Sequence, residues 1–160
     1  MKDRTGAGIV VGALERLGVK TIFGIPGIHN LDIYDELLDT EMEHVTARNE
    51  SGAGFMADGY GRSTGVPGVA LVITGPGLTN MFTPMGVALH DAVPMVVISS
   101  QLTREQLGKS RGELHELKNS TIAASSVSKE SRRVSSIEEV EPTLRWAYGL
   151  AQSGRPGPVH

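Results

Sequence analysis

The amino-acid sequence predicts an α/β protein with a doubly wound (Rossmann-like) parallel sheet flanked by helices. Three observations support this class. Short apolar runs alternate with segments whose apolar residues recur at helical spacing. One run, residues 67–75, is continuous and rich in β-branched residues, as expected of a parallel strand covered on both faces. Glycine and proline punctuate the junctions between these segments.

The first part of the chain divides into two helix–strand pairs. Residues 5–18 carry apolar side chains at helical spacing, and Gly18 suits the C-terminal cap of that helix. Residues 19–26 follow as a short buried strand. Helical spacing returns over residues 29–40, and residues 43–48 are expected to form the second strand.

The middle of the chain contributes two more strands, at residues 67–75 and 94–100. Residues 77–92, between them, have helical spacing. Pro84 lies inside this segment, and we expect it to remove one backbone hydrogen bond and kink the helix. Residues 101–121 are polar and interrupted by glycine, so they are expected to form a loop with at most one helical turn.

The last part of the chain is expected to hold a weaker, partly exposed strand within residues 122–135. An amphipathic helix follows over residues 136–154, with Ser136 as its cap. Residues 154–160 look like a loop entering a further strand. A strand that stops at its first residues predicts that this chain is one piece of a longer polypeptide.

Composition limits the class of protein. A chain of 160 residues suits one domain, residues 1–160. Fifteen Lys and Arg against 18 Asp and Glu give a net charge of −3, and no basic run occurs, so binding to nucleic acid or a membrane is not expected. There is no cysteine, long apolar run or signal-peptide pattern, which predicts a soluble, cytoplasmic protein without a metal site of its own.

The segment after the second strand is unusual because a helix opening on Asn49 and Glu50 contains many glycines. They stand at positions 52, 54, 59 and 61. An interior glycine destabilises a helix by roughly 0.5–1 kcal/mol relative to alanine, so something must approach this backbone closely. Asn49 suits the N-cap, and the helix dipole alone would favour Glu50. The position of Glu50 after a buried strand, on a helix with few large side chains, makes it a candidate site residue.

Four loops follow strands and converge at one edge of such a sheet, where ligands bind. They are residues 24–30, 48–53, 74–80 and 99–106. The third loop begins like a dinucleotide-binding motif with Gly75 and Gly77. Asn80 stands in place of its third glycine, however, and no acidic residue ends a second strand about 20 residues later. We therefore expect a tight turn and not a dinucleotide site.

Four motifs in this order resemble the N-terminal, pyrimidine-binding domain of the thiamine diphosphate enzymes. That group includes acetolactate synthase, pyruvate oxidase and the 2-oxo acid decarboxylases. The motifs are FGIPG (23–27), RNE followed by GAGFMADGYGR (48–62), TGPGLTN (74–80) and ALHDAVPMVVIS (88–99). The resemblance extends from residue 5 to the end of the chain, and it implies a thiamine diphosphate-binding fold.

The resemblance implies roles for particular residues. Glu50 matches the catalytic glutamate that hydrogen-bonds the pyrimidine N1′ and favours the tautomer whose 4′-nitrogen accepts a proton from the thiazolium ring. Pro26 matches the loop that lies against the pyrimidine. Thr74, Gly75 and Asn80 match the loop that borders the cofactor.

The resemblance also bears on the substrate, which is expected to be a 2-oxo acid. Residues 112–119 resemble the segment that supplies an active-site Gln in acetolactate synthases and a His pair in pyruvate decarboxylases. His115 is therefore a second catalytic candidate, the alternative being a solvated loop histidine. Ile28 stands where pyruvate decarboxylases carry an acidic residue. Ile28 and His29, together with the triplet LHE, look most like the decarboxylase acting on 5-guanidino-2-oxopentanoate.

In that family the cofactor is held between this domain and a diphosphate-binding domain, which could be supplied in cis or in trans. The resemblance implies a homodimer or tetramer built through the Gly/Ala-rich helix 50–62. It also implies Mg²⁺ bound by the other domain, since neither the Gly-Asp-Gly segment nor the following Asn-Asn occurs here. Three interpretations stay open: a domain of a longer 2-oxo acid enzyme, a separate subunit of a two-chain decarboxylase, and a non-catalytic Rossmann-like interaction module.

Overall fold

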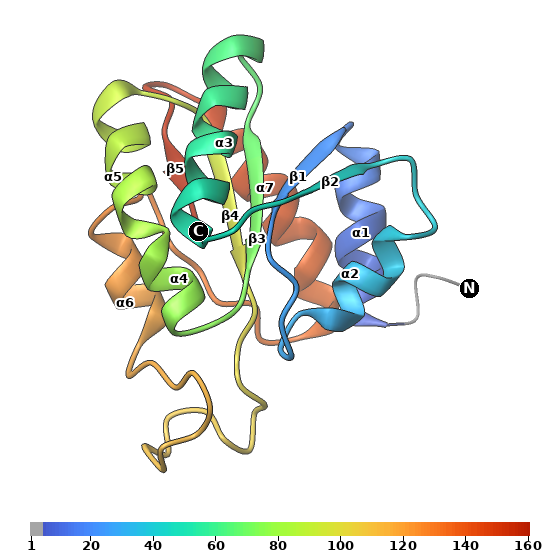
Figure 1. Ribbon diagram of the computed structural model, residues 1–160, viewed down its shortest axis with the longest axis vertical. Coiled ribbons are helices and arrows are strands. Elements are labelled where there is room, and N and C mark those ends of the chain that lie inside the picture. The colour runs from blue at the N-terminus through green and yellow to red at the C-terminus, as the bar shows by residue number, and fades with distance from the viewer. Residues whose placement is uncertain (1–4) are drawn as a thin grey trace.

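A computed structural model describes residues 5–160 and confirms the expected class (Figure 1). Five parallel strands form one sheet in the order β2-β1-β3-β4-β5. They are β1 (Thr21–Gly24), β2 (Glu43–Thr46), β3 (Gly68–Val72), β4 (Met95–Ser99) and β5 (Pro158–Val159). The chain moves outward from β1 to β2 and then crosses back to β3, so the topological switch lies between β1 and β3. The carboxyl ends of the strands share one edge, at the bottom of Figure 1.

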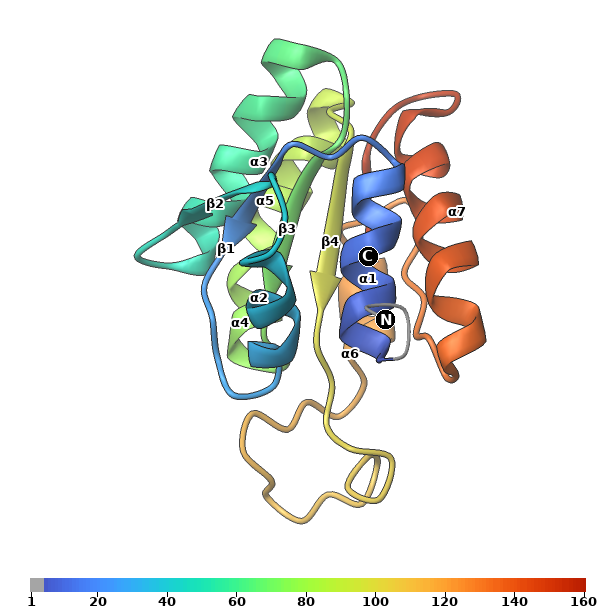
Figure 2. The same ribbon diagram turned by 90° about the vertical axis from the view of Figure 1, so that its right-hand side faces the viewer.

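Helices cover both faces of the sheet, which gives three layers (Figure 2). One face is covered by α1 (Gly6–Arg16), α2 (Leu31–Leu37) and α7 (Val140–Gln152), the last preceded by a 3₁₀ turn at Ile137–Glu139. The other face is covered by α3 (Glu50–Thr64), α4 (Pro76–Asn80), α5 (Phe82–Asp91) and α6 (Ser120–Ser125). Within residues 5–160, no helix combines the length and apolar character needed to cross a membrane.

The central strand β3 explains the uninterrupted apolar run of the sequence. All five of its residues are buried. Val69 and Leu71 belong to the core beneath α1, α2 and α7, whereas Ala70 and Val72 belong to the core beneath α3, α4 and α5. Successive side chains of a strand point to opposite faces, so a strand covered on both sides needs an apolar residue at every position.

The irregularity expected at Pro84 is present, but as a break and not as a kink. The segment divides at Met81 into α4 and α5, and Pro84 lies in the first turn of α5. Backbone N–H groups in a first turn have no intrahelical partner, so the ring of Pro84 is tolerated there. The carbonyl of Asn80, four residues before Pro84, is thereby left free for another donor.

Two expectations about the last part of the chain are wrong. Residues 122–135 form no strand, because α6 occupies their beginning and Glu130 makes only an isolated bridge to Val159. Asn119 is the N-cap of α6, and its side chain accepts from the N–H of Ile122 at 2.9 Å. Ser136 makes no side-chain cap bond, since the chain enters α7 through the 3₁₀ turn.

Candidate functional site

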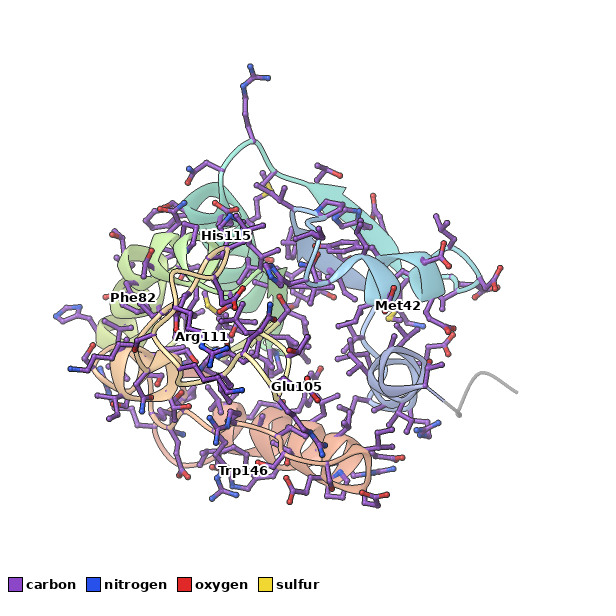
Figure 3. All side chains as sticks on the ribbon, turned by 90° about the horizontal axis from the view of Figure 1, so that it is seen from below. Met42, Phe82, Glu105, Arg111, His115 and Trp146 are labelled. Atoms are coloured by element: carbon purple, nitrogen blue, oxygen red, sulfur yellow. The ribbon has the colours of Figure 1, made fainter. Side chains whose placement is uncertain are left out.

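The candidate residues gather at the carboxyl edge of the sheet, around the switch between β1 and β3. Figure 3 looks onto this edge and shows His115 on the loop that crosses it. That loop, residues 100–119, extends beyond the strand ends in Figures 1 and 2. Loops that diverge at a topological switch leave a crevice between them, which is where ligands of open α/β sheets bind.

Glu50 is the first residue of α3, and its carboxylate is held in place. Asn49 caps the helix as expected, its side chain accepting from the N–H of Ser51 at 2.9 Å. The Oε2 atom of Glu50 accepts from Nδ2 of Asn80 at 2.8 Å. Within residues 5–160 this is the hydrogen bond that fixes the half-buried carboxylate, and it leaves Oε1 available.

Asn80 is fixed in turn by a second bond to the same helix. Its backbone carbonyl, left free by Pro84, accepts from the hydroxyl of Ser51 at 2.6 Å. A helix-interior residue other than proline would have donated to that carbonyl. The break between α4 and α5 therefore clamps the end of α4 to the beginning of α3, and it orients the amide that holds Glu50.

Tyr34, on α2, lies close enough to Glu50 to interact with the charge of its carboxylate. Its hydroxyl donates to the carbonyl of Leu71 at 2.8 Å, and Gly24 leaves room for it, because a Cβ at that position would collide with both groups. Burial, with a smaller contribution from the charge of Glu50, raises the pKa of Tyr34 well above its usual range. Tyr34 therefore remains a neutral donor that adds no charge beside Glu50.

Thr74 lies inside the protein, at the end of β3. It is fully buried, and its hydroxyl donates to Oε1 of Gln101 at 3.2 Å. Gln101 also donates to the hydroxyl of Ser120 at 2.9 Å. These bonds tie the end of β3 to the loop after β4 and to α6. No local pattern in the sequence marks Gln101 for this role, since its partners Thr74 and Ser120 are distant in sequence.

Gly75 and His115 meet through their backbones. Gly75 has φ 62° and ψ −118°, and a Cβ there would overlap the carbonyl of His115. His115 itself has φ 61°, a left-handed conformation that is uncommon for residues with a side chain. Glu116 closes the turn around it, because its Oε2 accepts from the N–H of Gly112 at 2.9 Å. The loop after β4 is thus pinned to the turn after β3.

The turn after β1 brings His29 to the same place. Asn30 is 2% exposed, and its Oδ1 accepts from the N–H of Gly27 at 2.7 Å, which fixes the turn. The ring centroids of His29 and His115 lie 5.5 Å apart. Pro26 is exposed in this turn, and no described contact joins it to Glu50. The structure thus brings together two groups, Glu50 with Asn80 and His115 with Gly75 and His29.

A separate cavity of about 220 Å³ lies between strand β4 and the helices α1 and α7. Its lining includes Ile98, Leu144, Trp146 and His160, and none of the predicted site residues. The ring of His160 bridges Ser99 and Ser131 at 2.6 and 2.7 Å, and burial lowers its pKa to about 4. The cavity is mostly apolar and has no carboxylate, so it does not compete with the crevice as the candidate site.

A parallel sheet of this order, with a fixed carboxylate beside the switch point, defines a Rossmann-like domain that takes a ligand at its strand ends. Sequence comparison identifies which one. Residues 4–123 match the family described as thiamine pyrophosphate enzyme, N-terminal TPP binding domain, and the chain belongs to that family. The resemblance drawn from the sequence motifs is therefore confirmed.

Individual relatives agree with this family. A probable 2-ketoarginine decarboxylase of Pseudomonas aeruginosa is 44% identical over 159 residues, which cover 99% of this chain and 28% of that protein. The acetolactate synthase isozyme 2 large subunit of Escherichia coli is 40% identical over 154 residues, covering 96% and 28%. The chloroplastic acetolactate synthase of Arabidopsis thaliana is 38% identical over 159 residues, covering 99% and 23%. The chain thus spans 23–28% of the length of these relatives.

The described residues fit one half of thiamine diphosphate. The carboxylate of Glu50 has an available oxygen that suits a ring nitrogen of the aminopyrimidine, and Asn80 fixes its direction. The diphosphate half needs Mg²⁺ or a cationic cradle. Residues 5–160 contain no cluster of three metal-ligating His, Cys, Asp or Glu side chains. The site therefore fits the pyrimidine and does not fit the metal–diphosphate group.

Proposed function

We propose that this chain forms the pyrimidine-binding wall of a thiamine diphosphate site in an enzyme that acts on 2-oxo acids. The observation that carries the proposal is the carboxylate of Glu50, held by Asn80 beside the topological switch. When bound, the cofactor supplies a nucleophilic thiazolium carbon for the carbonyl group of the substrate. The relatives, a probable 2-ketoarginine decarboxylase and acetolactate synthases, support 2-oxo acids as substrates and leave decarboxylation and carboligation as the two reactions.

In this proposal Glu50 holds a proton shared with the pyrimidine N1′, and Asn80 keeps the carboxylate pointed at that atom. Tyr34 supports the arrangement as a neutral neighbour. The exposed ring of Pro26 offers an apolar surface to the pyrimidine, and Gly75 lets the turn after β3 pack against the carbonyl of His115. Each contribution is one of position or of proton transfer, as expected for residues that activate a cofactor.

The diphosphate and Mg²⁺ are proposed to bind a second domain, in cis or in trans. This division is supported by the side chains of residues 5–160, which offer a carboxylate for the ring and no metal-binding cluster. The relatives, which are about four times as long as the matched region, have room for such a domain. The coding sequence that follows His160 distinguishes the arrangements: a diphosphate-binding domain there would support cis, and a stop codon would support a separate subunit.

The outward face of α3 is the proposed contact with a second copy of this chain, in a dimer or tetramer. Gly52, Phe55, Met56 and Gly59 follow the three- and four-residue spacing of one helix face. Phe55 and Met56 are 45% and 40% exposed. A Cβ at Gly52 or Gly59 would meet nothing within 4 Å, so packing inside this chain gives no reason for either glycine. A closely approaching partner helix would give one.

The test compares Glu50→Gln with wild type in the assembled enzyme, meaning this chain together with its diphosphate-binding domain. We expect kcat to fall about 10²- to 10⁴-fold, because the variant cannot share a proton with N1′. Circular dichroism should be unchanged. Calorimetry measures whether thiamine diphosphate still binds. The matched control is Glu15→Gln, which removes an exposed carboxylate on α1 and should leave kcat at the wild-type value.

A second variant tests how Glu50 is held. Asn80→Ala removes the amide that orients the carboxylate, and should lower kcat less than Glu50→Gln because the carboxylate itself remains. Wild-type turnover in Glu50→Gln would refute the catalytic assignment. An assembled enzyme that fails to bind thiamine diphosphate would refute the proposed function as a whole, and would favour a non-catalytic interaction module.

A further inference from the structure

We propose that Ser51 and Pro84 are positioning residues that aim the carboxylate of Glu50 by holding Asn80 in place. The inference rests on the proposed function and extends it to two residues that act only through Asn80. Ser51 follows Glu50 in the first turn of α3. Asn80 is the last residue of α4, and Pro84 lies in the first turn of α5. We call Ser51, Asn80 and Pro84 together the α3–α4 latch.

Asn80 is bound by two consecutive residues of α3. Its side-chain Nδ2 donates to Oε2 of Glu50 at 2.8 Å, and its backbone carbonyl accepts from the hydroxyl of Ser51 at 2.6 Å. With the first bond alone, the amide and the carboxylate could swing together as a pair. The second bond ties the main chain of Asn80 to the helix that carries the carboxylate, so the direction of the pair is fixed. Groups held in place beforehand lose little conformational freedom when a ligand binds.

The bond from Ser51 needs a carbonyl that the helix has not already used. In a continuous helix the N–H of residue 84 would donate to the carbonyl of residue 80. Pro84 has no N–H, and a proline ring crowds the carbonyl four residues before it. The regular pattern resumes at the next residue, because Met85 donates to the carbonyl of Met81 at 2.9 Å. The proline therefore frees the carbonyl of Asn80 in particular.

The ring of Pro84 also fixes the spacing between the helices. Pro84 is buried, and its ring packs directly on Gly54 of α3. A Cβ added at Gly54 would lie 2.3 Å from Cγ and 2.7 Å from Cβ of Pro84. Gly54 follows Glu50 by four residues and Ser51 by three, so these residues share one face of α3. The proline thus holds the break against the face of the helix that presents Glu50.

The latch is costly for local structure, which favours a functional reason for it. The break leaves α4 only five residues long, far shorter than a helix that is stable by itself. The proline also removes one helical hydrogen bond. Local rules of this kind are broken mainly at functional sites. Here the break lies beside the residue whose amide holds the carboxylate of Glu50.

The experiment measures turnover by the assembled enzyme, with pyruvate and 5-guanidino-2-oxopentanoate as the substrates tested. Ser51→Ala removes the hydroxyl, and Pro84→Ala introduces an N–H that competes for the carbonyl of Asn80. Each should lower kcat about 2- to 10-fold, the effect of one neutral hydrogen bond, with KM unchanged. Because kcat is referred to the concentration of bound thiamine diphosphate, a loss of folded protein does not lower it.

The double variant Ser51→Ala/Pro84→Ala tests whether the two residues act through the same carbonyl. If they do, it should lose no more than the larger single loss, whereas independent residues would multiply their losses. The controls are Pro142→Ala and Ser125→Ala, which should leave kcat unchanged. Pro142 is likewise the third residue of a helix, but it is exposed on α7. Ser125 likewise donates its hydroxyl to a backbone carbonyl, that of Ile122 in α6.

A second measurement depends neither on turnover nor on the cofactor. In the isotope-labelled chain of 160 residues, the two protons of the Asn80 side-chain amide should have well separated NMR resonances, because one of them donates to Glu50. Ser51→Ala and Pro84→Ala should reduce the separation, and Pro142→Ala should not.

Three results would overturn the inference and leave the Glu50→Gln result intact: wild-type kcat in both single variants, multiplied losses in the double variant, or unchanged Asn80 resonances. Failure of the wild-type assembled enzyme to bind thiamine diphosphate would instead refute the proposed function, whether or not the resonances move.

Discussion

Two glycines of α3, only two residues apart, should respond in opposite directions to the same substitution. A Cβ added at Gly61 would lie 2.7 Å from the carbonyl oxygen of Pro94 and 2.9 Å from Cγ1 of Val93. A Cβ added at Gly59 would meet nothing within 4 Å. Both positions lie inside the helix Glu50–Thr64. Gly61→Ala therefore tests packing against the β3–β4 side of the chain, and Gly59→Ala tests a face that this chain leaves open.

The magnitudes follow from two opposing effects. Alanine stabilises a helix interior by about 0.5–1 kcal/mol relative to glycine. Gly59→Ala gains this without a clash, so the free energy of unfolding of the single chain should rise by about 0.5–1 kcal/mol. Overpacking destabilises by about 1–3 kcal/mol, so Gly61→Ala should show a net loss centred on about 1 kcal/mol, within about 0–2.5 kcal/mol, after the helix gain is subtracted. The difference between the variants is thus about 1–3 kcal/mol.

Urea denaturation of the 160-residue chain, followed by circular dichroism, measures both changes. The midpoints should move in opposite directions with the slope m unchanged. Sedimentation of the same proteins tests the proposed partner: the new methyl group of Gly59→Ala stands on the outward face, so the dissociation constant of a dimer should increase. A Gly59→Ala variant that destabilises the single chain would refute the assignment of that face as open. One that stabilises it and associates as wild type would refute the proposed contact.

Three further predictions follow from buried polar groups. Tyr34→Phe should lower the free energy of unfolding by about 1–2 kcal/mol in urea denaturation, because the carbonyl of Leu71 loses its buried donor. Thr74→Val keeps the side-chain shape but removes the hydroxyl bonded to Gln101, and should lower the same quantity by about 1 kcal/mol. The pKa of His160 is about 4 in the folded chain and 6.5 when unfolded, so the unfolded state binds its proton more tightly. The contribution of neutral His160 to the free energy of unfolding is complete above pH 6.5. It should be lost as the pH falls to about 4, which lowers the free energy of unfolding by up to about 3 kcal/mol. His160→Gln should flatten this part of the curve of stability against pH.

The order and type of the elements could be predicted because the dominant forces are local or periodic. The apolar runs became β1 to β4 within a few residues of the expected limits. Strand order was not predicted, since it depends on which strands pair across the chain. The expected strand within residues 122–135 failed because the Asn119 cap and the contacts of α6 with α4 outweigh a few β-branched residues.

The candidate site could be predicted only in part, for a related reason. A glutamate at the start of a helix after a strand is visible in sequence. That Asn80 lies beside Glu50 is not visible, since 30 residues separate them and their contact depends on the break at Met81. The pairing of His29 with His115 spans an even longer stretch of chain. The buried environment of Thr74 was likewise hidden, because its partner Gln101 follows the next strand.

The glycines of α3 explain how one helix can serve two neighbours. Gly54 and Gly61 are seven residues apart, close to two helical turns, and both face the body of the chain, where Gly54 lies against Pro84. Gly52 and Gly59 have the same spacing on the opposite side. Glu50 precedes Gly54 by four residues, so its carboxylate lies in line with the inner glycines and reaches Asn80. A partner packed on the outer glycines would cover this helix end from the other side. Close backbone approach at the inner and outer glycines, together with Phe55 and Met56 on the outer face, is what would then exclude water from the carboxylate.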